Sequence, residues 1–213
     1  MHSPRDSGLK IAELLLNIQA VKINPEQPFR WASGWHSPIY CDNRLTLSHP
    51  EVRTAIRDAF VERIGDSFGT PDAIAGVATG AIAHGALVAD AMNLPFVYVR
   101  SQAKGHGLGN RIEGRIEAGR KVVVLEDLVS TGGSSLSAVQ ALRDAGVEVL
   151  GMAAIFTYGF DVARRNFEAE DCKLVTLTDY NQLLTVATHQ KKIRSEDLES
   201  LRAWRHSPET WGT

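Results

Sequence analysis

Apolar positions near the start of the chain recur with the spacing of an amphipathic helix. In residues 8–20 (GLKIAELLLNIQA) they return every three or four positions, which predicts a helix packed on the rest of the protein. A second helix is predicted for residues 50–64, with Ser48 as N-cap and Glu51 three residues later. Between them, residues 24–44 are rich in proline and turn residues, which predicts short strands and turns.

From residue 73 onward, short apolar runs alternate with helical patterns. The expected strands are residues 73–77, 96–100, 121–126, 147–156 and 173–177. The expected helices are residues 81–92, 135–145 (ended by Gly146) and 195–204 (capped by Ser195). Such alternation predicts an α/β fold with a mainly parallel sheet covered by helices on both faces. Ligands of these sheets bind beyond the carboxyl ends of the strands, so the segments that follow each strand matter most.

Length and composition narrow the class of protein. The 213 residues are expected to form one domain over residues 1–213, with a hood at about 20–45, a core at about 46–190 and a C-terminal helix at about 195–205. Hydrophobic residues make up 44% and charged residues 23%, which argues against disorder. The net charge is −2, so no basic excess predicts binding to nucleic acid.

Cysteine usage and the terminal segment indicate a compartment. Cys41 and Cys172 form no CxxC pair, which argues against a zinc ribbon or a disulfide scaffold and favours the reducing cytoplasm. No signal-peptide pattern and no apolar run of membrane-spanning length is seen, so we expect no membrane partner. The histidines show no metal-ligand spacing, and no structural metal is expected.

Two acids followed by hydroxyls and glycines come after the third expected strand. Glu126 and Asp127 precede Ser130, Thr131, Gly132, Gly133, Ser134 and Ser135. Glycines let the backbone approach a ligand, and amides at a helix N-terminus with nearby hydroxyls bind phosphate. The adjacent acids would repel a phosphate, so we expect them to accept hydrogen bonds from vicinal ribose hydroxyls. The bland alternative is a helix cap beside an incidental acidic turn.

A second polar stretch, residues 100–114 (RSQAKGHGLGNRIEG), has glycines at three alternate positions. It predicts a mobile loop that carries Arg100, Lys104 and His106. Such a loop could place positive charge over a diphosphate leaving group and exclude water. The alternative is a solvated hairpin with scattered basic residues.

These segments carry a family resemblance. VVVLEDLVSTGGSS resembles the signature with which type I phosphoribosyltransferases bind phosphoribosyl diphosphate (PRPP). Residues 33–44 (SGWHSPIYCDNR) and the loop at 100–114 resemble the matching segments of orotate phosphoribosyltransferases. The resemblance implies the type I phosphoribosyltransferase fold with a small N-terminal hood. It also implies conversion of orotate and PRPP to orotidine 5'-monophosphate and pyrophosphate, in the biosynthesis of UMP.

Residue roles follow from the same resemblance. The catalytic residues it implies are Lys104, His106 and Asp127. The PRPP-binding residues are Arg100, Lys104, His106, Glu126, Asp127, Leu128, Val129, Ser130, Thr131, Gly132, Gly133 and Ser134. The orotate-binding residues that the resemblance implies are Ser130, Tyr40 and Cys41. Mg²⁺ is implied as a cofactor bound mainly through PRPP, without direct protein ligands, and a homodimer with shared active sites is implied as the assembly.

The chain departs from the enteric form of the family at several positions. The enteric form has a lysine at the position of Ala32, a tyrosine-lysine pair at the position of Ala78-Thr79 and a lysine at the position of Ser101. It also has an arginine in the region where this chain has Thr157-Tyr158-Gly159-Phe160. The orotate carboxylate therefore lacks an expected partner, and Arg44 in the hood is the candidate. Three alternatives stay open: a phosphoribosyltransferase for a purine or uracil, an inactive PRPP-sensing regulator that binds nucleic acid or protein, and an unrelated α/β protein.

Overall fold

A six-stranded sheet forms the centre of the computed structural model, which describes residues 4–31, 34–102 and 111–211. The strand order is β10-β9-β8-β5-β6-β7; all neighbours are parallel except the antiparallel pair of β6 and β7. The strands are β5 (Ala73–Val77), β6 (Phe96–Val99), β7 (Ile112–Glu113), β8 (Lys121–Val129), β9 (Glu148–Thr157) and β10 (Leu174–Asp179). The expected α/β class with a mainly parallel sheet is confirmed.

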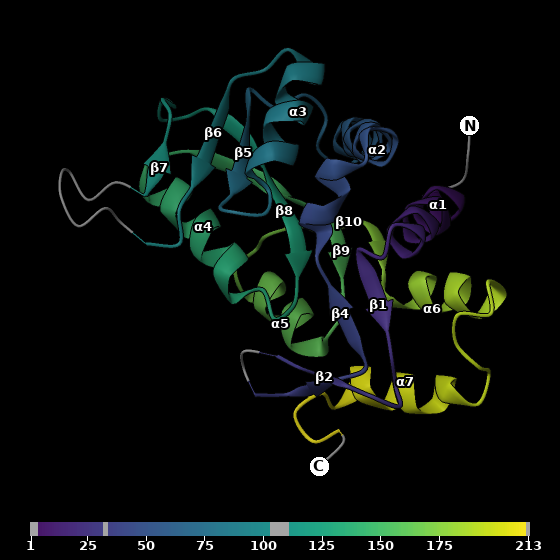
Figure 1. Cartoon of the computed structure of the whole chain (residues 1–213). Helices are drawn as coiled ribbons and strands as arrows, with labels where there is room; N and C mark the ends of the chain where they lie inside the picture. The colour runs from purple at the N-terminus through teal and green to yellow at the C-terminus, as the bar shows by residue number, and fades with distance from the viewer. Residues whose placement is uncertain (1–3, 32–33, 103–110, 212–213) are drawn as a thin grey trace.

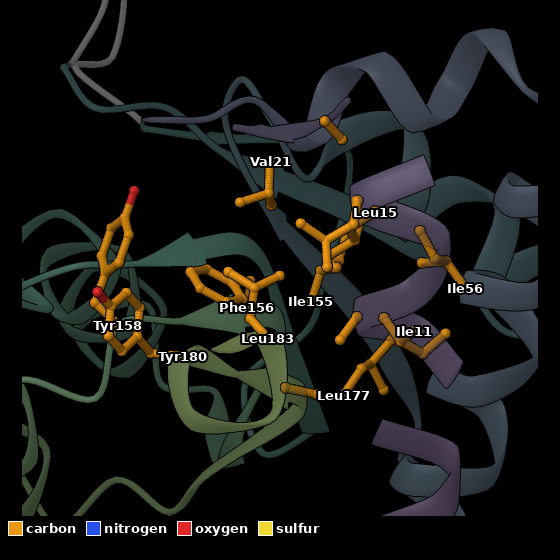
Figure 2. Packing of buried hydrophobic residues seen from close by; sticks show 14 of the residues in the cluster. Ile11, Leu15, Val21, Ile56, Ile155, Phe156, Tyr158, Leu177, Tyr180 and Leu183 are labelled. Carbon is orange, nitrogen blue, oxygen red and sulfur yellow. The ribbon is translucent and has the colours of Figure 1, made fainter. Parts of the chain in front are cut away.

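Helices cover both faces of the sheet, as Figure 1 shows. They are α1 (Pro4–Asn17), α2 (Pro50–Phe68), α3 (Ile82–Met92), α4 (Gly133–Asp144), α5 (Asp161–Ala169), α6 (Tyr180–His189) and α7 (Asp197–His206). Alternation along β8 explains the two layers. Val123 and Leu125 pack with α1, α2, α3 and α6, a cluster seen in part in Figure 2, whereas Val122 and Val124 pack with α4 and α5. Burial on both faces is why this strand reads as a continuous apolar run.

The hood consists of two small antiparallel pairs and a short 3-10 helix. Strand β1 (Val21–Ile23) pairs with β4 (Ile39–Cys41), and β2 (Phe29–Arg30) pairs with β3 (His36–Ser37). The 3-10 helix η1 (Asn43–Ser48) then leads into α2. The C-terminal helix α7 lies next to the hood (Figure 1), and the indole Nε1–H of Trp204 donates to the carbonyl oxygen of His36 at 3.1 Å.

The structure corrects several element boundaries. Strand β8 continues to Val129, so the two acids lie within it, and α4 begins at Gly133 rather than at residue 135. The predicted caps Ser48 and Ser195 are wrong. The N-cap positions belong to His49 and Glu196, neither of which forms a side-chain cap, because each helix starts later than its hydroxyl residue.

Helices α5 and α6 were not expected from the pattern. In α5 only Ala163 and Phe167 are buried, so the apolar signal is two residues four positions apart in a charged segment. In α6, Asp179 caps the helix through a hydrogen bond from the backbone N–H of Gln182 at 2.9 Å.

Within the described ranges, no helix is long and apolar enough to cross a membrane. Both cysteines are free thiols.

Candidate functional site

The acidic pair, Glu126 and Asp127, lies near the carboxyl end of β8. The side chain of Glu126 is only 5% exposed; the Ser135 hydroxyl donates to its Oε2 at 2.8 Å and the Asp127 N–H to its Oε1 at 3.1 Å. Burial, followed by the charge of Asp127, raises the pKa of Glu126, and burial also raises the pKa of Asp127. Two acids whose charged forms are penalised in this way favour neutralisation by hydrogen-bond donors or a cation.

A close approach by the turn after β5 fixes the position of the Asp127 carboxylate. Gly80 lies in this turn, directly after the cis peptide bond between Ala78 and Thr79. A Cβ atom at residue 80 would overlap the carboxylate of Asp127, so glycine is required for this approach. Neighbouring strands β5 and β8 thus bring their carboxyl-terminal segments to one place.

The hydroxyl turn, residues 130–134, connects β8 to α4. Gly132 has a φ of 87°, and a Cβ there would lie 2.8 Å from the Phe167 ring, so glycine is required at this position. The side-chain amide of Asn166 donates to the Thr131 carbonyl oxygen at 2.9 Å and holds the turn against α5. Gly132 is also the N-cap of α4, and it offers no side chain to the free amides of the first helical turn. This end of α4 can therefore bind an anion.

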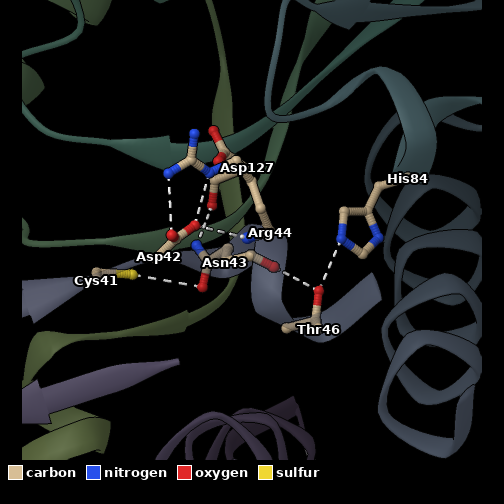
Figure 3. A network of polar contacts seen from close by, with 7 residues as sticks. All are labelled: Cys41, Asp42, Asn43, Arg44, Thr46, His84 and Asp127. Atoms are coloured by element: carbon tan, nitrogen blue, oxygen red, sulfur yellow. Dashed lines mark hydrogen bonds and ion pairs between the residues drawn. The ribbon is translucent and has the colours of Figure 1, made fainter. Parts of the chain in front are cut away.

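A polar network joins the hood to the acidic pair, as Figure 3 shows. The side-chain amide of Asn43 donates to the Asp127 carbonyl oxygen at 2.6 Å, and the Cys41 thiol donates to the Asn43 Oδ1 at 3.4 Å. The Thr46 hydroxyl donates to the Asn43 carbonyl oxygen at 2.5 Å and lies 2.9 Å from His84 Nε2. Burial, then the charge of Asp127, raises the pKa of Cys41, so this thiol stays protonated as the network requires.

A pocket of about 280 Å³ opens between the hood and the hydroxyl turn. We call it the base pocket; it is lined by Arg30, Trp31, Tyr40, Cys41, Leu128, Ser130 and Tyr158. Its aromatic walls are supported from behind, because the rings of Trp31 and Tyr158 lie 5.0 Å apart and each lies 5.6 Å from the ring of Trp204. A larger cavity of about 680 Å³ lies beside α5 and contains none of the predicted site residues.

The segment at 100–114 is described only at its two ends. The guanidinium of Arg100 lies 3.4 Å from the Glu113 carboxylate, and the backbone N–H of Arg100 donates to the Arg111 carbonyl oxygen at 2.9 Å. Arg111 donates in return to the Arg100 carbonyl oxygen at 2.9 Å and to Ser137 Oγ on α4 at 3.0 Å. These contacts bring the start and the end of the segment together and hold the end of the segment against α4. The predicted residues Lys104 and His106 lie outside the described residues.

Comparison with known proteins identifies the family. A family model for the phosphoribosyl transferase domain matches residues 46–189. The orotate phosphoribosyltransferase of Porphyromonas gingivalis is 57% identical over 205 residues, which cover 96% of this chain and 98% of the relative. The chain belongs to the orotate phosphoribosyltransferase family. It is therefore an enzyme of the phosphoribosyltransferase class.

Solved structures of the family have the same fold. The orotate phosphoribosyltransferase of Aeropyrum pernix matches with a TM-score of 0.75 at 28% identity, over 86% of this chain and 99% of that one. The Mycobacterium tuberculosis enzyme in complex with PRPP matches with a TM-score of 0.65 at 25% identity, over 83% and 98% of the two chains. The resemblance noted in the sequence is thus confirmed for family and fold.

Most of the predicted site residues that the structure describes lie together. The acidic pair, the hydroxyl turn and the base pocket are continuous, since Ser130 belongs to both the turn and the pocket. The three residues predicted to bind orotate, Tyr40, Cys41 and Ser130, all line the base pocket. Val129 is fully buried, which leaves only its backbone for a ligand. Leu128 faces the base pocket rather than the turn.

One candidate is placed elsewhere, and several neighbours were missed. Arg44 does not line the base pocket; its guanidinium is held by Asp42 at 2.7 and 2.9 Å. Sequence reasoning did not single out Asn43 or Gly80 as parts of the site, nor Arg30 as part of the pocket. The rule that parallel strands end at one edge would have drawn attention to Gly80, which follows β5.

Proposed function

We propose that the protein binds PRPP on residues 126–134 and orotate in the base pocket, and forms orotidine 5'-monophosphate for UMP biosynthesis. Residues 1–213 act in this proposal as one domain. The observation that carries it is the shared position of Ser130 at the junction of the base pocket and the hydroxyl turn. A pyrimidine in the pocket and a sugar phosphate on the turn would then meet at the acidic pair.

The reaction exchanges one bond at C1 of the ribose for another. The bond from C1 to the diphosphate oxygen breaks and its electron pair leaves with pyrophosphate; N1 of orotate forms the new bond to C1 and gives up its proton to the departing pyrophosphate or to solvent. Glu126 and Asp127 hold the ribose hydroxyls, while residues 130–134 hold the 5-phosphate at the N-terminus of α4. Orotate is already an anion and N1 needs little activation, so the residues act mainly by positioning the reactants.

Negative charge develops on the leaving diphosphate and needs cations nearby. Arg100, Lys104 and His106 fill this role in the proposal, with Lys104 and His106 assigned by resemblance alone. Mg²⁺ bound to the diphosphate would neutralise further charge there. The described residues contain no group of three or more His, Cys, Asp or Glu side chains that could hold a metal ion. A metal held mainly by the substrate fits this donor set, with the acidic pair as the nearby carboxylates.

A homodimer with shared active sites and a cytoplasmic location complete the proposal. The dimer rests on the resemblance of the segment at 100–114 to a loop that reaches the neighbouring subunit in the family. The location is supported by the free thiols of Cys41 and Cys172, which suit a reducing compartment. Sedimentation of the purified protein at several concentrations tests the dimer.

A coupled assay tests the activity. Orotate and PRPP should be consumed one for one in the presence of Mg²⁺, with stoichiometric pyrophosphate. Parallel reactions with uracil, hypoxanthine and adenine separate this function from that of other phosphoribosyltransferases. Tight, steeply salt-dependent binding of an oligonucleotide without turnover would instead identify a regulator.

A further inference from the structure

The base pocket holds one full positive charge among its lining residues. Cys41 and Tyr158 both have a pKa that burial raises, so their side chains are neutral hydrogen-bond donors. Ser130 is a neutral hydroxyl, and Trp31 and Leu128 supply apolar surface. Arg30 is the lining residue that carries a charge at neutral pH. The pocket is therefore a mostly apolar cavity with a cation on its wall.

The guanidinium of Arg30 is available to a ligand. Within residues 4–31, 34–102 and 111–211, it forms no hydrogen bond or ion pair with another side chain. Arg44, by contrast, already carries a bidentate contact from Asp42, which compensates its charge. Arg205 donates to the Gly159 carbonyl oxygen at 3.0 Å and lines the cavity beside α5 instead.

The neighbours of Arg30 hold its backbone in place. Arg30 pairs with His36 across the β2–β3 hairpin. The next residue, Trp31, is anchored by its indole N–H, which donates to the Ile39 carbonyl oxygen at 3.2 Å, and by its ring, 5.0 Å from that of Tyr158. Arg30 lines the base pocket beside Trp31 and is exposed to solvent, so its side chain lies at the rim of the pocket. Because the Arg30 guanidinium has no side-chain partner among the described residues, it can bind a ligand without breaking an existing ion pair.

We propose that Arg30 binds the carboxylate of orotate and so sets the preference for a carboxylated pyrimidine over a neutral one. This inference rests on the proposed function. A planar guanidinium matches a carboxylate with two parallel charge-assisted hydrogen bonds. Neutral donors such as Ser130 and Tyr158 would serve the ring carbonyl groups, which uracil also has. The arginine therefore separates the two bases by the one group in which they differ.

The test compares Arg30→Gln and Arg30→Lys with the wild-type enzyme. Loss of the charged contact in Arg30→Gln should raise the KM for orotate about 10- to 100-fold. The KM for PRPP and the inhibition constant of uracil, as a competitor of orotate, should change less than twofold. Arg30→Lys keeps the charge but not the planar fork, so it should recover part of the affinity. Arg57→Gln on α2, an arginine paired with Asp58, serves as a matched control and should behave as wild type.

Three outcomes would overturn the inference. The first is an orotate KM within twofold of wild type in Arg30→Gln. The second is an equal loss of affinity for orotate and uracil, which would indicate a general collapse of the pocket. The third is a larger rise in the orotate KM from Arg44→Gln than from Arg30→Gln. Failure of the proposed function is distinct from all three, since the wild-type protein would then not consume orotate and PRPP at all.

Discussion

The side-chain amide of Asn43 donates a hydrogen bond of 2.6 Å to the backbone carbonyl oxygen of Asp127, across 84 positions of sequence. The pairing of β8 with β5 ends at Leu125. The register of β8 with β9 includes Glu126 and Leu128 but not Asp127. The carbonyl group of Asp127 accepts this hydrogen bond from the hood at a position where neither register pairs Asp127 with a residue of β5 or β9. One amide therefore fixes the hood relative to the acidic pair.

Asn43→Leu keeps the volume of this side chain and removes the donor. A carbonyl group left buried without a partner costs about 1–3 kcal/mol, so the free energy of unfolding should fall by that amount, seen as a lower midpoint of urea unfolding with an unchanged m value. Because the hood then moves relative to Asp127, we expect kcat/KM to fall about tenfold for both orotate and PRPP. Asn17→Leu, at an exposed position at the end of α1, is the control and should change neither quantity. Wild-type stability in Asn43→Leu would mean that other contacts hold the hood.

Gly80→Ala tests the approach of the β5 turn to the acidic pair. The added methyl group would overlap the Asp127 carboxylate, which must then move. We expect kcat/KM for PRPP to fall at least tenfold, because a displacement of about 1 Å at a reacting centre has an effect of this size or larger. Gly65→Ala is the matched control: it lies within α2 with nothing within 4 Å of the new Cβ, and should stabilise the helix by about 0.4–1 kcal/mol. Equal kinetics in the two variants would contradict the assigned position of Asp127.

Glu126 should make the unliganded protein less stable as the pH rises. Burial, and then the charge of Asp127, raise its folded-state pKa to about 8, so between pH 4.5 and about 8 the folded state binds more protons than the unfolded one. The free energy of unfolding therefore falls with pH across that window. Glu126→Gln removes this dependence and should stabilise the protein by on the order of 1–3 kcal/mol at pH 7, while it lowers activity with PRPP. Urea unfolding at pH 5, 7 and 8.5 measures the slope; an unchanged slope in the variant would refute the assignment.

His84 should act in the opposite direction on the acid side. Burial, followed by the charge of Arg53, lowers its pKa to about 4, and its Nδ1 is buried without a partner among the described residues. Between pH 6.5 and about 4 the unfolded state binds the extra proton, so stability is full above pH 6.5 and is lost as the pH falls. The loss amounts to about 3 kcal/mol at most. His84→Gln should flatten this acid limb, whereas exposed His206→Gln on α7 should leave it unchanged.

The sequence carries the fold and the local parts of the site, but not the contacts between distant segments. The apolar runs of β5, β6, β8, β9 and β10 predict the sheet, because the apolar side chains that bury each strand are contiguous in the sequence. The acidic pair and the hydroxyl turn are contiguous in sequence, so their chemistry could be read directly. The bond from Asn43 to Asp127 depends on how two segments 84 residues apart pack, and no local pattern encodes it.

The assignment of Arg44 to the orotate carboxylate shows the same limit. Position in the hood made Arg44 a candidate, yet Asp42, only two residues earlier, holds its guanidinium at 2.7 Å. That ion pair was accessible from the sequence, whereas the position of Arg30 on the pocket rim required the β2–β3 hairpin. The roles of Lys104 and His106 stay predictions.

Trp204 connects stability to the base pocket. Its fully buried ring lies 5.6 Å from the rings of both Trp31 and Tyr158, which line the pocket, and its N–H donates to the His36 carbonyl oxygen. Trp204→Phe should cost about 1–3 kcal/mol through the lost hydrogen bond and a smaller ring. Because its contacts support the pocket walls and not the hydroxyl turn, the KM for orotate should rise more than the KM for PRPP. Trp211→Phe is the control: it removes only a solvent-exposed hydrogen bond from the indole N–H to Ser200 Oγ and should have little effect. An equal rise of both KM values in Trp204→Phe would contradict the prediction, because the aromatic cluster would then support the whole site.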